Sequence, residues 1–310
     1  MKGIMFTAKG VTELIDEPEP QPGQDQLLLK TLYSAVSNGT ERSFLTGGAY
    51  GGQRWPNRIG YLTVSEVAQV GKAVTSYAEG DLVYTGTFCG HVAYHCARER
   101  DLIIKVPASL DPKAATLLGL AGVSYFNAAR AGINETDKVL VTGGGGIGLT
   151  ALQAAKALGA DATLVSATGH RRAQGLAAGA DLALAPDDAA LAESGPYSVL
   201  LECAGAQLDD LIDPQKTLLA PFARVALIAG RFRADYNFLW ASRLRLSFCQ
   251  STHFDRPTLA EVTALAAAGR FDLAALIQDV VPLSRAVETY DTLRDRPLTL
   301  GGTVFDWTAV

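Results

Sequence analysis

The sequence predicts an α/β protein of two domains, in which a mostly β N-terminal region precedes a region of parallel βαβ units. Three observations lead to this fold class. The chain has 310 residues, which suggests two domains at about 150 residues each. Short apolar runs separated by turn residues fill the segment 1–112. Beyond it, Ala- and Leu-rich segments of helical length alternate with short β-rich runs.

The predicted elements follow in order along the chain. The N-terminal region carries the apolar runs LLLKTLYSAVS, LTVSEVAQVG and GDLVYTG between turn-forming residues. Predicted strands VLVTG, ATLVSA, YSVLLECAG and ARVALIAG come next, separated by helical stretches. Two further helical stretches, LAEVTALAAAGR and SRAVETYDTLRD, precede a last strand ending in FDW. We therefore expect domain boundaries that divide the chain into 1–112, 113–252 and 253–310.

Composition excludes several function classes. A hydrophobic fraction of 48% with 19% charged residues is typical of a globular protein, and a net charge of −5 without charge runs argues against nucleic-acid binding. The longest uncharged stretch, Val139 to Ala155, is interrupted by five glycines and makes a poor membrane span. Four cysteines without a CxxC pair, and a start without an apolar signal segment, favour the cytoplasm.

The segment VLVTGGGGIG carries the sharpest local signal. Gly143, Gly145 and Gly148 have the spacing G-x-G-x-x-G, with a predicted strand before them and a predicted helix after them. Gly143 permits the tight turn, Gly145 allows close approach of a pyrophosphate, and Gly148 lets the helix pack on the strand. The helix N-terminus then faces the phosphates. This turn, with Gly146 and Ile147 in it, predicts a dinucleotide-binding domain of the Rossmann type.

The end of the next strand bears on which dinucleotide is bound. An NAD-binding protein usually places Asp or Glu there for the ribose hydroxyls, whereas this chain has Ser166 and Thr168, followed by Arg171 and Arg172. Hydroxyl and guanidinium groups can hold a 2′-phosphate that a carboxylate would repel. We therefore favour NADPH/NADP+ over NADH. The alternative is that both arginines simply solvate the following helix.

The order of these segments resembles the medium-chain dehydrogenases and reductases, the zinc-containing alcohol dehydrogenase superfamily, across essentially the whole chain. GDLVYTG, GHVAY, KVP, ATLLGLAGVSYFNA, LLECAG and RVALIAG are similar to its successive landmarks. The resemblance implies a GroES-like β domain, a Rossmann domain, a C-terminal segment returning to the first domain, and an active site in the cleft between the domains. It also implies cofactor contacts at Ser124, Cys203, Ala204, Gly205 and Gly230.

The chain departs from this family at the positions of the catalytic zinc ligands. Ser37 stands at the position of the first cysteine, and Tyr61 stands where a GHE motif would place histidine. The structural-zinc lobe is missing as well. Because zinc is held by Cys, His or carboxylate, we expect a zinc-free member without a metal site. The cluster CGHVAYHC, with Cys89, His91 and His95 on one strand face, is the remaining metal candidate.

Among zinc-free members, SAVSNGTERSFLTGG and the Gly-Tyr pair resemble the hydroxyethyl bacteriochlorophyllide dehydrogenase-like group. This resemblance implies a zinc-independent dehydrogenase or reductase and does not identify a pigment as substrate. Without a Lewis acid, the alkoxide formed in carbonyl reduction needs hydrogen-bond or proton donors. We expect Tyr61 to be the acid/base. Further catalytic residues are expected in the loop that faces the nicotinamide in this family: Ser37, Thr40 as a relay to the ribose, and Glu41 as a partner for a polar substrate. The expected substrate-binding residues are Asn38, Arg42, Tyr50 and Trp55.

Alternatives remain for the site and for the function. Tyr61 can be a core residue, Glu41 and Arg42 can form a structural ion pair, and Tyr50 and Trp55 can pack in the core. The leading expectation is hydride transfer between NADP(H) and a secondary alcohol or ketone of a small polar molecule, such as a sugar, cyclitol or hydroxyalkyl compound. Reduction of an activated C=C bond is the second reading, and non-catalytic nucleotide binding is the third. We also expect a homodimer formed through the strand ARVALIAG.

Overall fold

A computed structural model describes the whole chain except residues 50, 206–207 and 230–233. The described residues form two compact units. The first unit comprises Met1–Gly119 and Leu273–Val310, and the second comprises Leu120–Asp272. Each unit has its own sheet system and its own hydrophobic core.

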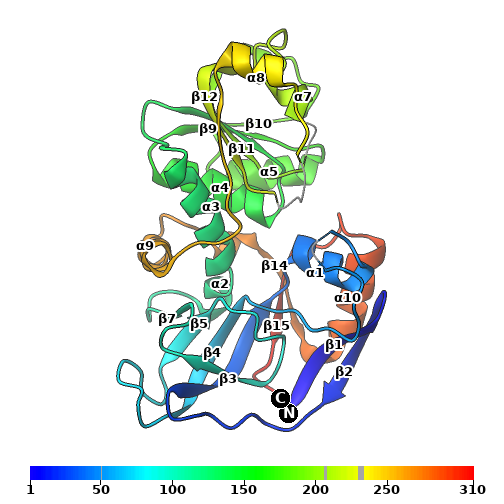
Figure 1. Cartoon of the computed structure of the whole chain (residues 1–310), viewed down its shortest axis with the longest axis vertical. Helices are drawn as coiled ribbons and strands as arrows, with labels where there is room; N and C mark the ends of the chain where they lie inside the picture. The colour runs from blue at the N-terminus through cyan, green and yellow to red at the C-terminus, as the bar shows by residue number, and fades with distance from the viewer. Residues whose placement is uncertain (50, 206–207, 230–233) are drawn as a thin grey trace. The chain divides into compact units, whose positions relative to one another are not determined.

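The first unit is built mainly from antiparallel strands (Figure 1). Its seven-stranded sheet has the order β14-β15-β3-β4-β5-β7, with β6 also paired to β3, and β1 and β2 form a separate hairpin. The strands are β1 Lys2–Ala8, β2 Val11–Asp16, β3 Gln26–Ala35, β4 Thr63–Val70, β5 Leu82–Thr85, β6 Tyr94–Arg98, β7 Ile103–Lys105, β14 Ile277–Pro282 and β15 Gly302–Asp306. The helices are α1 Asn38–Thr46, α2 Pro112–Ala115 and α10 Ala286–Asp295, with 3-10 turns η1 Ala274–Leu276 and η2 Leu283–Arg285.

The two ends of the chain share the core of this unit. Ile4 and Phe6 of β1 are buried in one cluster with Tyr290 of α10, Phe305 of β15 and Trp307. Strand β15 pairs antiparallel with β3, which joins the C-terminal segment to the central sheet. Residues near both termini therefore build the environment of α1, whose first turn carries several predicted site residues.

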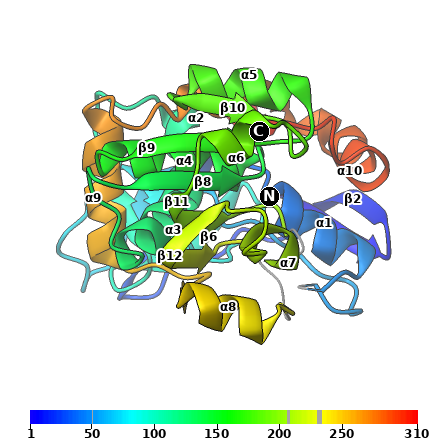
Figure 2. The same ribbon diagram turned by 90° about the horizontal axis from the view of Figure 1, so that it is seen from above.

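The second unit is a six-stranded parallel sheet with the order β10-β9-β8-β11-β12-β13 (Figure 2). This is the doubly wound Rossmann order, so the predicted fold class of this region is confirmed. The strands are β8 Lys138–Thr142, β9 Asp161–Val165, β10 Leu182–Leu184, β11 Tyr197–Glu202, β12 Leu219–Leu227 and β13 Ser247–Cys249. The helices are α3 Leu118–Arg130, α4 Gly146–Ala157, α5 Gly169–Ala177, α6 Ala190–Glu193, α7 Leu208–Ile212, α8 Phe238–Leu244 and α9 Arg256–Ala267.

The second unit extends further along the chain than the expected boundary after residue 252. Helix α9 belongs to it because its side chains pack on α3. The Tyr125 hydroxyl donates a hydrogen bond of 2.5 Å to Glu261, and the Tyr125 ring meets Phe271 edge-on. Phe254 lies against Gly122, where no larger side chain would fit. The return to the first unit therefore begins at Leu273.

The strand expected to pair with its copy in a dimer is not at an edge of the sheet. β12, which contains ARVAL, lies between β11 and β13, and both neighbours are hydrogen-bonded to it. Self-pairing through β12 was therefore a wrong expectation, because β13 already occupies its outer edge. The short strand β13 was missed because SFC gave no periodicity long enough to read. Among the described residues, no helix combines the length and the apolar character needed to cross a membrane.

Candidate functional site

Three hydroxyl groups meet at the N-terminal end of α1. The Tyr61 hydroxyl lies 2.7 Å from Ser37 Oγ and 3.4 Å from Thr40 Oγ1. Ser37 precedes α1, Thr40 lies in its first turn, and Tyr61 comes shortly before β4. Tyr61 and Thr40 are partly exposed, whereas Ser37 is buried. The structure thus brings together three of the four predicted catalytic residues, in a group able to exchange protons.

The Ser37 hydroxyl is available to Tyr61 because it does not cap the helix. A serine at the N-cap usually accepts a hydrogen bond from the backbone N–H of the first turn. Ser37 occupies the N-cap of α1, yet its side chain makes no capping bond. Instead the Ser37 backbone N–H donates to Glu41 Oε1 at 2.8 Å. The carboxylate thereby holds the residue while its hydroxyl faces Tyr61.

Glu41 itself lies in the core, contrary to the expectation that it would meet a polar substrate. Its side chain has no solvent exposure. Glu41 Oε2 accepts from Tyr290 at 2.5 Å and lies 3.2 Å from His91 Nε2. Burial and contact with Glu41 raise the pKa of Tyr290 well above its usual value, so this hydroxyl keeps its proton and donates. The proposed ion pair with Arg42 is also absent, because these partners draw the carboxylate inward.

Phe88 is a neighbour of Tyr61 that sequence reasoning missed. Its ring centroid lies 4.9 Å from that of Tyr61, yet 67% of the residue is exposed. The loop is held by a hydrogen bond from the Gly90 N–H to the Gly60 carbonyl, and by the Cys89 thiol directed at the same carbonyl. In the sequence, an aromatic residue between Gly86 and Gly90 was the feature that could have pointed to Phe88. Phe88 places an apolar surface beside the Tyr61 hydroxyl.

The described residues that were predicted to bind substrate make structural contacts within the first unit. Asn38 donates its amide to the carbonyls of Leu300 and Gly301 at 2.9 and 3.3 Å, which ties α1 to the segment before β15. Arg42 is exposed and contacts the Arg294 carbonyl at 3.4 Å. Trp55 packs against the core and over Gly47, at the C-terminal end of α1. Tyr50 lies outside the described residues.

The residual metal candidate does not assemble. Cys89 and His91 precede the strand that contains His95, and the His91 ring nitrogens lie near Ser34 and Glu41. Within the described ranges, no group of three or more His, Cys, Asp or Glu side chains could hold a metal ion. The period-two reasoning failed because residues 89–93 are not part of a regular strand.

The glycine-rich turn of the second unit has the geometry that its spacing predicts. Gly143 follows β8 with φ +86°, and α4 begins at Gly146 with Gly145 as its N-cap. A Cβ on Gly148 would lie 1.6 Å from the Gly143 carbonyl oxygen, so only glycine allows this packing. A Cβ on Gly145 would meet nothing within 4 Å. Open space therefore lies at an uncapped helix N-terminus, which suits a phosphate group.

Two predicted cofactor residues converge beside this turn. A Cβ on Gly144 would lie 2.7 Å from the Arg171 Cβ and 3.1 Å from Ser166 Oγ. Arg171 makes no ion pair with another described residue, whereas Arg172 donates to the Ser166 carbonyl at 2.8 Å. Thr168 is the N-cap of α5 and makes no side-chain capping bond. Arg171 and Thr168 are thus candidates for a ligand, and Arg172 holds the end of β9.

The turn after β11 lies against the glycine-rich turn. A Cβ on Gly143 would be 3.2 Å from Ala204, and the Cys203 N–H donates to the Thr142 carbonyl. The buried carboxylate of Glu202, which the sequence did not single out, accepts from the Ala204 N–H at 3.0 Å and from the Thr142 hydroxyl at 3.3 Å. Glu202 thereby joins the two turns. Gly205 has positive φ, and Gly230 lies outside the described residues.

Ser124 does not face a ligand, contrary to expectation. It is completely buried, and its hydroxyl lies 2.7 Å from Thr150 Oγ1 and donates to the Ile147 carbonyl. Thr150 bonds in turn to the Gly146 carbonyl. Ser124 therefore joins α3 to the first turn of α4 through its hydroxyl group.

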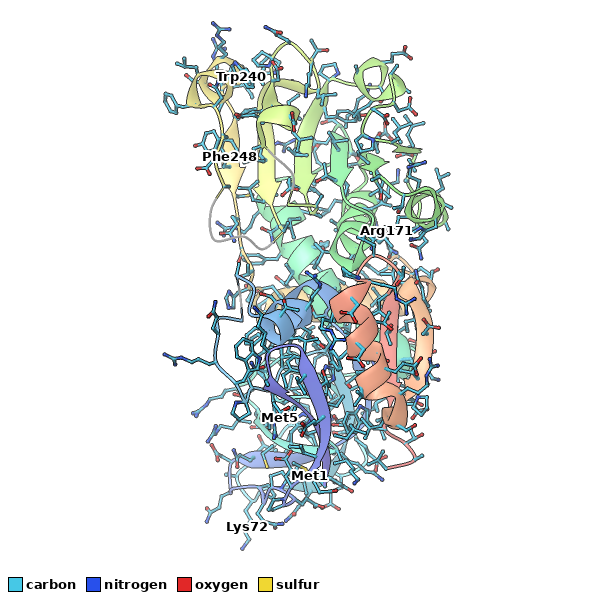
Figure 3. All side chains as sticks on the ribbon, turned by 90° about the vertical axis from the view of Figure 1, so that its right-hand side faces the viewer. Met1, Met5, Lys72, Arg171, Trp240 and Phe248 are labelled. Atoms are coloured by element: carbon cyan, nitrogen blue, oxygen red, sulfur yellow. The ribbon has the colours of Figure 1, made fainter. Side chains whose placement is uncertain are left out.

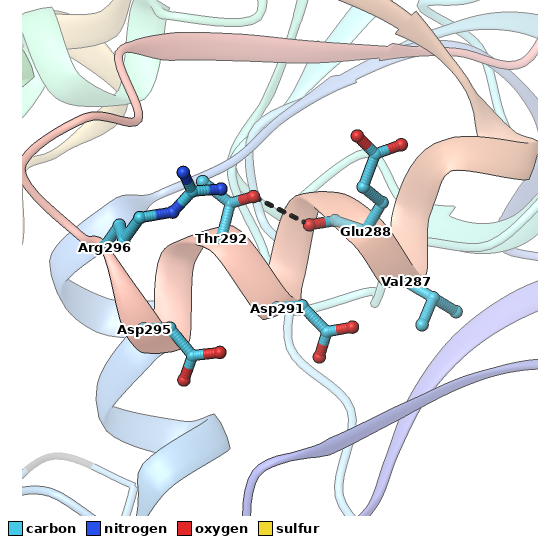
Figure 4. A pocket seen from close by; sticks show the side chains of 6 residues that line it. All are labelled: Val287, Glu288, Asp291, Thr292, Asp295 and Arg296. Carbon is cyan, nitrogen blue, oxygen red and sulfur yellow. Dashed lines mark hydrogen bonds between the residues drawn. The ribbon is translucent and has the colours of Figure 1, made fainter.

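A surface depression lies on one face of α10 (Figure 4). It is lined by Val287, Glu288, Asp291, Thr292, Asp295 and Arg296. Its carboxylates are neutralised locally, since Arg285 pairs with Glu288 and Arg294 pairs with both aspartates. None of the predicted site residues lines it.

The chain is similar in sequence to a known domain family and to several known dehydrogenases and reductases. Residues 23–128 match the alcohol dehydrogenase GroES-like domain. Sorbitol dehydrogenase of Halalkalibacterium halodurans is 25% identical over 245 residues, covering 66% of this chain and 71% of that protein. Acryloyl-coenzyme A reductase of Metallosphaera sedula is 30% identical over 178 residues, covering 48% of this chain and 53% of that protein.

Solved structures share the fold over nearly the whole chain. An alcohol dehydrogenase from Escherichia coli CFT073, complexed with the cofactor NADH, has a TM-score of 0.86 at 17% identity and covers 99% of both chains. A protein described as a zinc-binding dehydrogenase from Sinorhizobium meliloti 1021, bound to NADP, has a TM-score of 0.83 at 18% identity and covers 98% of both chains.

The domain match and the relatives support the medium-chain dehydrogenase/reductase superfamily of alcohol dehydrogenase-like oxidoreductases, and the solved structures show the same fold. The predicted combination of a GroES-like domain with a Rossmann domain is confirmed.

Proposed function

We propose that this chain is a zinc-independent, NADP(H)-dependent oxidoreductase that interconverts a secondary alcohol and a ketone of a small polar molecule. The observation that carries the proposal is the contact of 2.7 Å between the Tyr61 hydroxyl and Ser37 Oγ, in a partly exposed group of three hydroxyls. Such a group can deliver a proton to a developing alkoxide and be reprotonated.

Tyr61 is the proposed acid in carbonyl reduction and the base in alcohol oxidation. Its hydroxyl donates to the substrate oxygen, and Ser37 and Thr40 lie within reach to return a proton or to stabilise the remaining phenolate. Phe88 places an apolar ring beside this position. A nicotinamide cofactor, when bound, supplies or accepts the hydride.

The residues of the second unit suit such a cofactor. The open space at Gly145 and the close packing at Gly148 leave backbone N–H groups of α4 accessible to a pyrophosphate. Ser166 and Arg171 lie beside Gly144, where a 2′-phosphate would find a hydroxyl and a guanidinium. This supports NADPH over NADH, while fold neighbours complexed with NADH and with NADP show that the fold accepts both.

Zinc independence rests on the donor set. The side chains that contact the Tyr61 hydroxyl are those of Ser37 and Thr40, whereas zinc in proteins is bound by thiolate, imidazole or carboxylate. The His91 imidazole is directed to Ser34 and Glu41. We expect turnover to withstand complete removal of zinc.

Reduction of an activated C=C bond is the second candidate. Its specific support is the similarity to acryloyl-coenzyme A reductase, a protein whose name states that chemistry. The two activities differ in their product, since an enone yields a saturated ketone in one case and an allylic alcohol in the other. Product analysis with a single enone substrate decides between them.

The testing experiment begins with fluorescence titration of the zinc-stripped protein with NADPH and NADH, followed by a screen of ketones and enones. Tyr61→Phe is expected to lower kcat by roughly ten- to ten-thousand-fold while leaving the NADPH Kd unchanged, because only the proton donor is lost. Thr7→Val, which removes an exposed hydroxyl bonded to Glu13, is the matched control and should have no effect. Unchanged turnover in Tyr61→Phe removes Tyr61 from the mechanism, and failure to bind either cofactor favours a non-catalytic role.

We further propose a cytoplasmic homodimer. The described cysteines are all free thiols, which suits a reducing compartment. The dimer surface that the structure favours is the outer edge of β13 with its flanking apolar residues, among them Phe222, Phe238 and Leu239, which are 63%, 72% and 68% exposed. Trp240 and Phe248 mark this end of the sheet in Figure 3, and Arg171 lies at the opposite end. Sedimentation of Phe238→Asp beside the parent protein tests it, with a monomeric parent as the contrary result.

A further inference from the structure

We propose that Glu41 is a positioning residue for the Ser37–Tyr61 hydroxyl pair and acts from a buried hydrogen-bond network without touching substrate. The inference rests on the proposed function, in which Tyr61 carries the proton. It accounts for two observations: Glu41, four residues after Ser37, is fully buried, and the Ser37 side chain does not cap α1.

A consistent set of donors and acceptors satisfies every bond in the network. Trp307 Nε1–H donates to Ser34 Oγ at 2.8 Å, and the Ser34 hydroxyl then donates to His91 Nδ1 at 2.8 Å. His91 Nε2–H donates to Glu41 Oε2 at 3.2 Å, and Tyr290 donates to the same oxygen at 2.5 Å. A neutral imidazole and an ionised carboxylate fulfil all of these roles at once. Both donors fix Oε2, so Oε1 keeps a single orientation.

Oε1 is the point at which the network reaches the hydroxyl pair. It accepts the Ser37 backbone N–H at 2.8 Å, and this bond is buried. Loss of this buried acceptor leaves the Ser37 N–H unpaired, which is unfavourable. Without the carboxylate, the Ser37 hydroxyl can turn to the orphan N–H groups of the first helical turn, as serines at this position usually do. Tyr61 then loses its neighbour at 2.7 Å.

The network also makes the pair depend on distant parts of the chain. Tyr290 lies 249 residues after Glu41, in α10, and Trp307 follows β15 near the C-terminus. The Tyr290 ring packs against Phe6 and Phe305, and the His91 ring packs edge-on against Phe305, so these contacts position both donors to Oε2. The folded C-terminal segment of the first unit therefore sets the geometry of a hydroxyl pair near residue 40.

The test is a double-mutant cycle between Glu41→Met and Ser37→Ala, with Glu41→Gln as rescue. Methionine keeps the length of the side chain and lacks an acceptor. Glutamine keeps the Oε1 acceptor when His91 takes its other tautomer, in which Nδ1–H donates to Ser34 and Nε2 accepts from the glutamine amide. We expect Glu41→Met to lower kcat about tenfold or more with little change in KM, and Glu41→Gln to recover to within about threefold of the parent. Glu41→Met should lower the kcat of Ser37→Ala by no more than about twofold, since it acts through Ser37.

Readouts separate this inference from the proposed function. The Kd for NADPH, which depends on the second unit, should stay unchanged in every variant. NMR signals of isotope-labelled Tyr61, assigned with Tyr61→Phe, report the hydroxyl pair without any substrate. They should shift alike in Glu41→Met and Ser37→Ala. If the parent protein turns nothing over, the proposed function fails, and these signals still decide whether Glu41 positions Tyr61.

If Glu41→Met does not fold, Tyr290→Phe replaces it, because this change removes one donor to Oε2 and keeps the ring. It should lower kcat in the parent and leave Ser37→Ala unaffected. Tyr125→Phe is the matched control, since it removes a hydrogen bond of 2.5 Å between tyrosine and Glu261 in the other unit, and it should change neither readout. The inference would be overturned if the Glu41 or Tyr290 variant lowers kcat equally in the parent and in Ser37→Ala, or does not lower kcat at all. An unaltered NMR signal of Tyr61 would overturn it as well.

Discussion

His95 offers a quantitative test of how burial is linked to stability. It lies in β6, opposite Leu29 of β3, and is only 5% exposed. Neither ring nitrogen has a hydrogen-bond partner among the described residues. Burial lowers the pKa of His95 from 6.5 to about 4, because an imidazolium in apolar surroundings loses its hydration without compensation. In the unfolded chain the ring titrates near 6.5.

The sign of the effect follows from proton uptake. Between pH 6.5 and about 4 the unfolded chain binds a proton at His95 that the native protein does not, so acid favours unfolding. The stabilisation is complete above pH 6.5 and is lost as the pH falls toward 4. Over the whole window, the pKa difference of His95 lowers the free energy of unfolding by about 3 kcal/mol. Between pH 7 and pH 4.5 it lowers this free energy by about 2 kcal/mol.

The assay compares urea unfolding of the parent and His95→Leu at these two pH values. Two of the three tryptophans, Trp55 and Trp307, share the compact unit of His95, so tryptophan fluorescence follows its unfolding. The parent should lose about 2 kcal/mol more than His95→Leu on acidification, because other titrating groups contribute equally to both. His170→Leu removes an exposed histidine and should behave like the parent. Equal losses in the parent and in His95→Leu would refute the reasoning.

Three further predictions concern the second unit and the thiols. Gly148→Ala should lower the free energy of unfolding by about 3 kcal/mol in urea denaturation, because its Cβ would lie 1.6 Å from a carbonyl oxygen. Gly145→Ala, whose Cβ would meet nothing within 4 Å, should retain stability and weaken cofactor binding in a fluorescence titration. Arg171→Ala should raise the Kd for NADPH by roughly tenfold or more and leave the Kd for NADH unchanged; a parallel change in both would remove Arg171 from the phosphate site. Burial raises the pKa of Cys89 to about 11, so at pH 8 only about one thiol in a thousand is ionised, and mass spectrometry should find Cys89 alkylated only after denaturant is added.

The sequence alone determined the elements whose signals are local. The strand-turn-helix around Gly143 to Gly148 was predictable because the backbone itself requires glycine there, through a positive φ and a close approach to a carbonyl. The parallel order of the second unit followed from the alternation of helical and β-rich segments. The meeting of Ser37, Thr40 and Tyr61 was foreseen from the resemblance to a family, since 21 and 24 residues separate Tyr61 from its two partners.

Only the tertiary structure decided what depends on packing between distant segments. Glu41 was expected to face substrate because it lies in the loop that the family resemblance places beside the nicotinamide. It is buried because Tyr290, far along the chain, and His91 supply donors that no local pattern reveals. Ser124 turned inward for a similar reason, since Thr150 of α4 bonds to its hydroxyl. Sequence patterns record the conformation and exposure that a residue prefers by itself, whereas the direction of a polar side chain is set by the partners that the folded chain brings to it.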